Sequence, residues 1–229
     1  MKLKKIRENG DIPEVRANNI IINRTARYFT LGDENGDSVS EVWFVLHGYA
    51  QLASEFIRNF EVIDDGSRLI VAPEGLSRFY IKNGTGHIGA SWMTSEDRLN
   101  EIEDYLSYLS KVNDQLHSSL KKRNIKTCLL GFSQGASTAT RWFEKSGINF
   151  NRLILWGGHL ASDFNLNNSK YRETDISLVY GAEDKFLLPT YFEEDISNLK
   201  KHGIAYRLFS FNGGHLIDPD TLIKVASAT

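Results

Sequence analysis

The sequence predicts a single α/β domain over residues 1–229, in which a mostly parallel central sheet is flanked by helices. From about residue 40 onward, apolar runs of strand length alternate with stretches of helical periodicity, which is the rhythm of βα units. Several of these runs end in a glycine-containing loop, as strands do where an open α/β sheet binds its ligands. No internal repeat and no Pro-, Gly- or Ser-rich linker divides the 229 residues, which favours one domain.

The expected strands are short apolar runs, and the continuous ones are typical of strands buried on both faces. They cover residues 42–46, 68–72, 126–130, 153–156, 176–180 and 206–211. Residues 27–31 alternate between polar and apolar side chains and precede a turn-like segment at residues 32–36. This alternation predicts an edge strand of a hairpin.

Helices are expected between the later strands. One begins at Ser95, a candidate N-cap, and repeats apolar residues at helical spacing as far as Leu116. Three more are expected at about residues 134–145, 190–200 and 220–226. Residues 74–94, which carry several glycines, are expected to form the longest loop.

Composition excludes several classes of protein. Hydrophobic residues make up 41% and charged residues 24% of the chain, which is ordinary for a soluble globular protein. The formal net charge of −2 lacks the basic excess of a nucleic-acid binder. No run approaches the roughly 18–20 apolar residues that span a bilayer, and the N-terminus lacks the pattern of a secretory signal. We therefore expect a cytoplasmic protein with no membrane span.

The sequence contains no motif that is typical of a metal or cofactor site. The single cysteine, Cys128, lies in an apolar run, which predicts a buried, unreactive thiol and no intrachain disulfide. No cluster of histidine, cysteine and carboxylate residues has metal-ligand spacing, and no glycine-rich phosphate loop is present. We expect neither a metal nor another cofactor.

The most specific motif is Gly131-Phe132-Ser133-Gln134-Gly135, which fits G-x-S-x-G between an expected strand and an expected helix. In this setting the motif is typical of the nucleophile elbow of the α/β-hydrolase fold. The chain must turn sharply and leave the serine exposed at the tip, and the two glycines reduce crowding there. Ser133 is therefore the candidate nucleophile.

A serine hydroxyl needs a base to take its proton, and this fold supplies Ser, acid and His in that chain order. His215 follows the last expected strand, and Asp184 follows the strand before it. We predict His215 as general base and Asp184 as the carboxylate that orients it. Glu183 is the alternative acid. The other histidines near strand ends or loops are His47, His87 and His159, whereas His117 and His202 lie in helical stretches.

A tetrahedral intermediate also needs N–H donors for its oxyanion. One is expected from Gln134, the residue after the nucleophile, and the other from the loop that follows residues 42–46. We favour the N–H of Tyr49 for the second donor, because the preceding His47-Gly48 pair lets the backbone turn. On this interpretation His47 is structural.

These motifs together resemble the phospholipase/carboxylesterase family, which includes acyl-protein thioesterases and small cytosolic carboxylesterases. The matching elements are Leu46-His47-Gly48, Gly131-Phe132-Ser133-Gln134-Gly135, Gly181 with Asp184, and Gly214-His215. The resemblance covers roughly residues 40–225 in motif order and implies hydrolysis of esters or thioesters without a cofactor. The chain departs from the family pattern at Ala136, in residues 49–51 and in residues 74–94.

The substrate pocket is expected to be open. About fifteen mainly polar residues, roughly 161–175, separate two expected strands, which is too short and too polar for a helical cap. Aromatic and histidine side chains near the expected site are candidates for lining it, with packing on the core as the alternative. They are Phe79, Tyr80, Trp92, Trp156 and His159.

The sequence thus predicts a serine hydrolase of the carboxylesterase type (EC 3.1.1-like). It is expected to cleave small-molecule esters with small to medium acyl chains through an acyl-enzyme intermediate. Two alternatives stay open: an acyl-thioesterase or peptidase with the same triad, and a binding protein with a hydrolase fold and little turnover. The sequence leaves the oligomeric state open.

Overall fold

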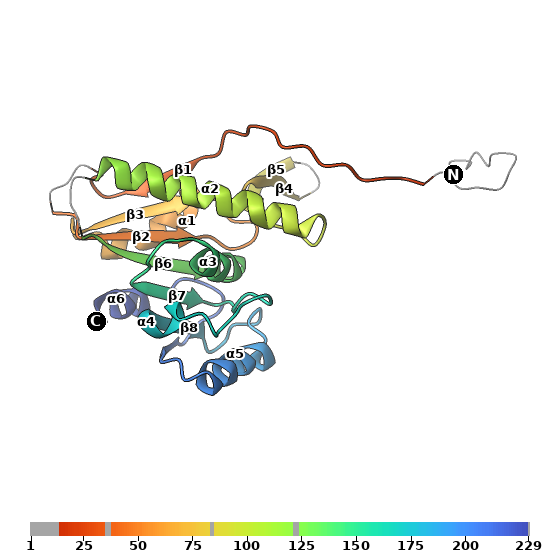
Figure 1. Ribbon diagram of the computed structural model, residues 1–229. Helices are drawn as coiled ribbons and strands as arrows, with labels where there is room; N and C mark the ends of the chain where they lie inside the picture. The colour runs from red at the N-terminus through yellow and green to blue at the C-terminus, as the bar shows by residue number, and fades with distance from the viewer. Residues whose placement is uncertain (1–13, 35–37, 83–84, 121–123, 229) are drawn as a thin grey trace, which may run out of the picture.

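The computed structural model describes residues 14–34, 38–82, 85–120 and 124–228. Its centre is a seven-stranded sheet in the order β1-β3-β2-β6-β7-β8-β9 (Figure 1). Only β1 runs antiparallel to its neighbour in this sheet, and the other strands pair in parallel. The strands are β1 (Tyr28–Leu31), β2 (Glu41–Leu46), β3 (Arg68–Pro73), β6 (Lys126–Phe132), β7 (Arg152–Trp156), β8 (Asp175–Gly181) and β9 (Arg207–Phe211).

Helices cover both faces of the sheet, as parallel strands require, because their crossovers pass over the faces. The α-helices are α1 (Ala53–Phe56), α2 (Arg98–Ser119), α3 (Gln134–Lys145), α4 (Lys170–Glu173), α5 (Pro189–Lys201) and α6 (Pro219–Ser227). A 3-10 helix, η1 (Ile57–Ile63), continues directly from α1. The predicted α/β-hydrolase architecture is confirmed.

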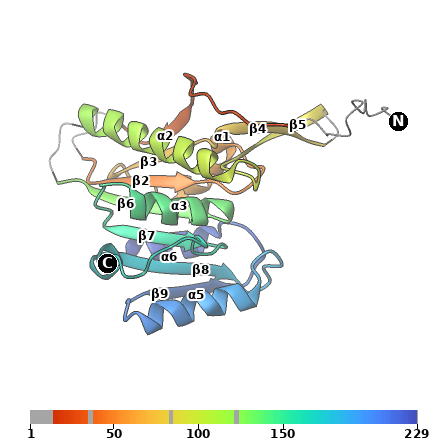
Figure 2. The ribbon, with the colours of Figure 1, turned by 45° about the vertical axis from the view of Figure 1, so that its right-hand side comes forward.

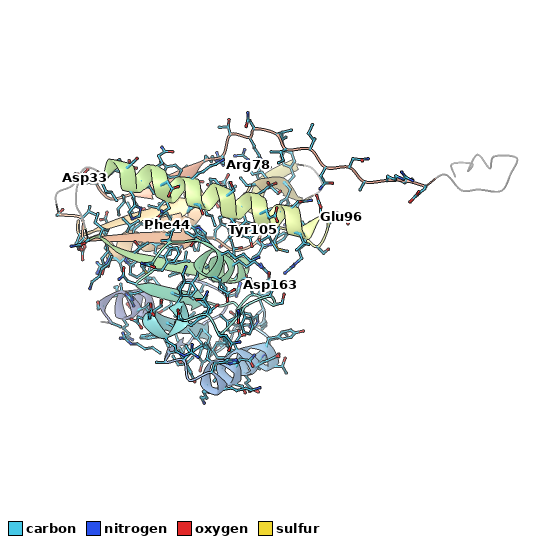
Figure 3. All side chains as sticks on the ribbon, in the orientation of Figure 1. Asp33, Phe44, Arg78, Glu96, Tyr105 and Asp163 are labelled. Atoms are coloured by element: carbon cyan, nitrogen blue, oxygen red, sulfur yellow. The ribbon has the colours of Figure 1, made fainter. Side chains whose placement is uncertain are left out.

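Two apolar layers hold the helices to the sheet. Successive side chains of a strand point to opposite faces, so Phe44 and Trp43 of β2 enter different layers. The layer of Phe44 packs α2, α3 and α5 on one face, where Figure 3 shows Phe44 and Tyr105 between α2 and the sheet. The layer of Trp43 packs α1, η1 and α6 on the other face (Figure 2).

The prediction of a long loop at residues 74–94 is wrong. This segment forms a two-stranded antiparallel hairpin, β4 (Ser77–Lys82) and β5 (Thr85–Ser91), separate from the main sheet (Figure 1). The glycines misled the prediction, because at least one serves close packing rather than loop flexibility. A Cβ added at Gly89 would lie only 2.4 Å from the carbonyl oxygen of Ala50.

Two boundaries also differ from expectation. Strand β1 lies at an edge as predicted, but it pairs with β3 rather than with the next strand in sequence. Helix α2 begins at Arg98 after Asp97, not at Ser95, because Asp97 has a positive φ of 49° that interrupts the helical backbone. The short elements α1, η1 and α4 were not predicted, since so few residues carry little periodicity.

The prediction that no cap domain covers the site is confirmed. Within the described residues, the connection from β7 to β8 contains only turns and α4. Among the described helices, none has both the length and the apolar character needed to cross a bilayer.

Candidate active site

Ser133 occupies the turn between β6 and α3, at the carboxyl end of the central strands. Its backbone is at φ 55° and ψ −119°, a region that L-residues seldom adopt. Such strain persists only where the surroundings hold it in place. Here the Ser133 N–H donates to the carbonyl oxygen of Trp156 at 2.9 Å, which ties the turn to the end of β7.

The two glycines of the motif lie at positions where a side chain has no room. A Cβ at Gly131 would lie 2.2 Å from the carbonyl oxygen of Gly135. A Cβ at Gly135 would lie 2.2 Å from the carbonyl oxygen of Leu46 at the end of β2. Any side chain at either position would push apart the strand, the turn and the first turn of α3.

His215 and Asp184 are in direct contact. Nδ1 of His215 lies 2.7 Å from Oδ2 of Asp184, whose side chain is 2% exposed. Oδ1 of Asp184 accepts the N–H groups of Phe186 at 2.8 Å and Leu187 at 3.2 Å. A carboxylate can only accept, so Nδ1 carries the proton and Nε2 is left as the basic nitrogen.

The histidine–aspartate pair lies beside the turn that carries Ser133. Gly157 directly follows Trp156, whose carbonyl receives the Ser133 N–H, and a Cβ at Gly157 would lie 3.3 Å from both Asp184 Oδ2 and His215 Nδ1. The ring of Phe132, adjacent to Ser133, has its centroid 4.7 Å from that of His215. The structure therefore brings His215 and Asp184 together and places both next to the residues flanking Ser133.

The loop after β2 approaches Ser133 from the other side. A Cβ added at Gly48 would lie 3.1 Å from Cβ of Ser133, so the backbone around Gly48 and Tyr49 is adjacent to it. The Tyr49 side chain is 58% exposed and its ring stacks on Phe79 of β4, with the centroids 5.2 Å apart. Gln134 is the first residue of α3, and the first N–H groups of a helix have no partner within it.

His47 is a buried part of the scaffold. Its Nε2 accepts the N–H of Gly75 at 2.9 Å, and its Nδ1 lies 2.7 Å from the carbonyl oxygen of Gly48. Burial lowers the pKa of this imidazole, because the charged form would lose its hydration. Both ring nitrogens already have backbone partners, which supports the structural interpretation.

The alternative histidines and the alternative acid lie elsewhere. His87 is exposed on β5, and Glu183 is exposed one residue before the aspartate that contacts His215. His117 and His202 pair through Nδ1 with the carbonyl oxygens of Asn113 and Asn198 in their own helices.

The five pocket candidates divide into two groups. Trp92 and Trp156 are 1% and 0% exposed, so both side chains pack in the core, which for Trp92 is the alternative given above. Phe79 is partly buried against Tyr49, and Tyr80 is 55% exposed on the same hairpin. His159 is partly exposed, with its Nδ1 3.5 Å from Oδ2 of Asp195.

Phe186 was not predicted, although it lies at the site. Its ring centroid is 5.1 Å from that of His215, and the side chain is 78% exposed. In the sequence, only its position two residues after Asp184 could have indicated that Phe186 lies at the site. Among the described residues, no group of three or more histidine, cysteine or acidic side chains could hold a metal ion.

Comparisons with known proteins agree with this fold. The model of the phospholipase/carboxylesterase family matches residues 35–228. The chain therefore belongs to the phospholipase/carboxylesterase family, a family of hydrolases, and the resemblance inferred from its motifs is confirmed. No protein among the curated sequences matches the chain.

Solved structures resemble the chain at low sequence identity. Esterase PE8 superposes with a TM-score of 0.67 at 21% identity, over 89% of this chain and 97% of its own. Acyl-protein thioesterase 2 of Zea mays gives a TM-score of 0.67 at 18% identity, over 88% and 96%. A carboxylesterase of Mesorhizobium loti gives 0.67 at 17% identity, over 89% and 95%. At these identities the likeness shows the shared fold.

Proposed function

We propose that this protein is a serine hydrolase that cleaves carboxylic esters through an acyl-enzyme intermediate. The observation that carries the proposal is the 2.7 Å contact between His215 Nδ1 and Asp184 Oδ2, beside a serine held at a strained φ of 55°. A binding protein has no need of a strained serine next to an oriented imidazole, whereas nucleophilic catalysis needs both.

The roles follow from the hydrogen bonds of His215 and Asp184. Nε2 of His215 takes the proton of Ser133 Oγ as that oxygen attacks the carbonyl carbon of the ester. The imidazolium then gives the proton to the departing alcohol, and a water molecule repeats the sequence to release the acid. Asp184 holds the tautomer and stabilises the imidazolium, and the two N–H groups that its other oxygen accepts hold the carboxylate in place.

The oxyanion hole is proposed to consist of the backbone N–H groups of Gln134 and Tyr49. Gln134 contributes the free N–H at the start of α3, where the helix dipole also favours negative charge. Tyr49 follows Gly48, whose backbone approaches Ser133. Preorganised donors of this kind stabilise the charge that develops on the carbonyl oxygen.

The proposed substrate is a small-molecule ester with a small to medium acyl chain. Without a cap, the site is bordered by aromatic side chains: exposed Tyr49 stacked on partly buried Phe79 on one side, and exposed Phe186 beside His215. Thioesters are the second class to test, because the fold resembles that of the Zea mays acyl-protein thioesterase 2.

The first prediction concerns the nucleophile. We expect the wild-type protein to hydrolyse p-nitrophenyl butyrate, and Ser133→Ala to reduce kcat by roughly 10⁴-fold or more, because the attacking oxygen is removed. Ser118→Ala on α2, which changes an exposed serine with the same loss of a hydroxyl, is the matched control. Full activity in Ser133→Ala would contradict the mechanism.

A fluorophosphonate probe separates an enzyme from a binding protein. Covalent labelling of the folded wild-type protein, lost in Ser133→Ala, is the expected result. No labelling and no hydrolysis of any ester or thioester by folded protein would favour the binding protein. Initial rates with paired esters and thioesters of graded chain length then identify the preferred class.

A further inference from the structure

We propose that the segment at the end of β5, residues 90–93 (the last two residues of the strand and the two that follow it), positions both halves of the oxyanion hole, with the side chains of Gln134 and Trp92 as its positioning residues. The inference rests on the proposed function, since it concerns the hole that this function needs. The two N–H donors come from different loops, one after β2 and one after β6. These two loops must be held in a fixed position relative to each other, and the segment at the end of β5 contacts both of them.

The first half of the hole is held through the Gln134 side chain. Its Oε1 accepts the N–H of Trp92 at 3.1 Å, and its Nε2 donates to the carbonyl oxygen of Met93 at 2.8 Å. The hydroxyl of Ser91 lies within hydrogen-bond distance of the same amide group. The residue that offers its backbone N–H to the substrate is thus anchored through its own side chain to the end of the hairpin.

The second half is held through Trp92 and through Ala90, two residues before it. The indole Nε1 of Trp92 donates to the carbonyl oxygen of His47 at 2.8 Å, and its ring stacks on His47 with the centroids 5.0 Å apart. Ala90 accepts the N–H of Ala50 at 2.9 Å and donates to the carbonyl oxygen of Gln51 at 3.1 Å. These bonds fix the loop on both sides of Tyr49.

Burial makes these contacts difficult to replace. Ser91 and Trp92 are each 1% exposed and His47 is fully buried, so water cannot take over a lost hydrogen bond without rearrangement. Catalysis depends on N–H groups already aimed at the position that the oxyanion will occupy. A shift of about 1 Å in such a group costs roughly 100-fold in rate. A loosened end of β5 would therefore reduce the rate of the chemical step more than the binding of substrate.

Two variants separate the two halves, each with a matched control. Gln134→Met keeps the length of the side chain and removes both hydrogen-bonding atoms, whereas Gln115→Met makes the same change on the exposed face of α2. Trp92→Phe removes the indole N–H, and Trp142→Phe does the same in the core, where the indole bonds to Ser110. Since the two substitutions remove different hydrogen bonds, the test survives if one variant does not fold.

The measurements are kcat and KM for p-nitrophenyl butyrate, together with inhibition by an alkyl trifluoromethyl ketone and by the matching methyl ketone. The fluorinated ketone adds the serine oxygen to form a hemiketal whose oxyanion occupies the hole, whereas the methyl ketone reports ground-state binding. We expect both variants to lose about 10- to 100-fold in kcat, with KM within about threefold of wild type. Affinity for the trifluoromethyl ketone should fall by the same factor as kcat/KM, and affinity for the methyl ketone should stay unchanged.

Three results would overturn the inference. The first is a kcat within threefold of wild type in both folded variants. The second is an equal loss of affinity for the two ketones, which indicates a deformed pocket. The third is an equal loss of kcat in the Gln115→Met and Trp142→Phe controls. In each case an active wild-type protein leaves the proposed function standing, whereas a wild-type protein without activity or labelling overturns the function itself.

Discussion

At the scale of single residues, the site depends on a few positions where close neighbours set the backbone conformation and the hydrogen bonds of the side chains. Ser133 has a positive φ although it is not glycine, and Gly131 and Gly135 have no room for a Cβ. The sequence motif predicted the sharp turn and the need for glycine on both sides of the serine, although the atom that a Cβ at Gly135 would meet belongs to Leu46 of the distant strand β2. The sequence favoured Asp184 as the partner of His215 but left Glu183 open, since adjacent residues of a loop point in directions that only the folded chain sets; the structure shows His215 in contact with Asp184.

The pH dependence of stability should report the burial of His47. Its pKa is lowered in the folded protein, so the unfolded chain, with an ordinary pKa of about 6.5, binds more protons in the range just below that value. The stabilising contribution of neutral, buried His47 to the free energy of unfolding is therefore complete above about pH 6.5. It is lost as the pH falls, by at most about 1.4 kcal/mol per pH unit.

Urea unfolding of wild type and His47→Asn between pH 7.5 and 5.5 measures this contribution. We expect a weaker loss of stability on acidification in the variant than in wild type, since the buried imidazole is gone. His87→Asn, at an exposed position on β5, is the control. An equal dependence on pH in wild type and His47→Asn would contradict the prediction.

At the scale of elements, the strands of the main sheet follow from local patterns, whereas the β4–β5 hairpin does not. Buried strands such as β2 and β6 appear as continuous apolar runs, and their boundaries are predicted within one or two residues. The sequence predicts a loop here because the glycines and polar residues of the hairpin hide the strand pattern. Its partners, the loop around Ala50 and the side chain of Gln134, come from segments distant in sequence.

The hairpin is also expected to contribute to substrate binding. Phe79 stacks on Tyr49 next to the site. An acyl chain that buries about one methylene group against this ring gains about 0.5–1.5 kcal/mol of binding free energy. Phe79→Ala should therefore raise KM for butyrate and hexanoate p-nitrophenyl esters by about 2- to 12-fold, with a smaller change for acetate.

Tyr80→Ala is the matched control for Phe79→Ala, because adjacent residues of a strand point to opposite faces and Tyr80 is 55% exposed. Steady-state kinetics over the ester series gives the comparison. Unchanged KM values in Phe79→Ala, or equal increases in both variants, would show that this face of the hairpin does not contact the acyl chain.

At the scale of the whole molecule, one buried carboxylate joins segments that are far apart in the chain. The Glu74 side chain is 1% exposed and accepts hydrogen bonds from Arg27 at 2.8 and 3.1 Å, from Arg78 at 3.3 Å and from the N–H of Ala53 at 3.3 Å. It thus connects the segment before β1, the start of β4 and the start of α1 to the end of β3. No local pattern marks Glu74, since its partners assemble only in the folded protein.

Replacing this carboxylate should destabilise the whole domain. Glu74→Gln keeps the shape but replaces one acceptor oxygen by a donor, so we expect a loss of about 2 kcal/mol in the free energy of unfolding. Glu61→Gln is the control, because Glu61 pairs with Arg58 at 3.5 Å on the exposed surface and should change stability by about 0.5 kcal/mol or less. Urea denaturation of the three proteins measures both values, and equal stabilities would contradict the role of Glu74.

The sequence by itself determined the class of fold, the strands of the main sheet, the serine turn and the chain order of Ser133, Asp184 and His215. These features depend on neighbours within a few residues, where periodicity, glycine placement and strand-to-helix spacing act directly. Only the tertiary structure decided that β1 pairs with β3, that residues 77–91 form a hairpin and that Trp92 is buried with its indole bonded to His47. Those outcomes depend on hydrogen bonds and packing between segments that are distant in the sequence. Which of these segments pair with one another is decided only when the whole chain folds.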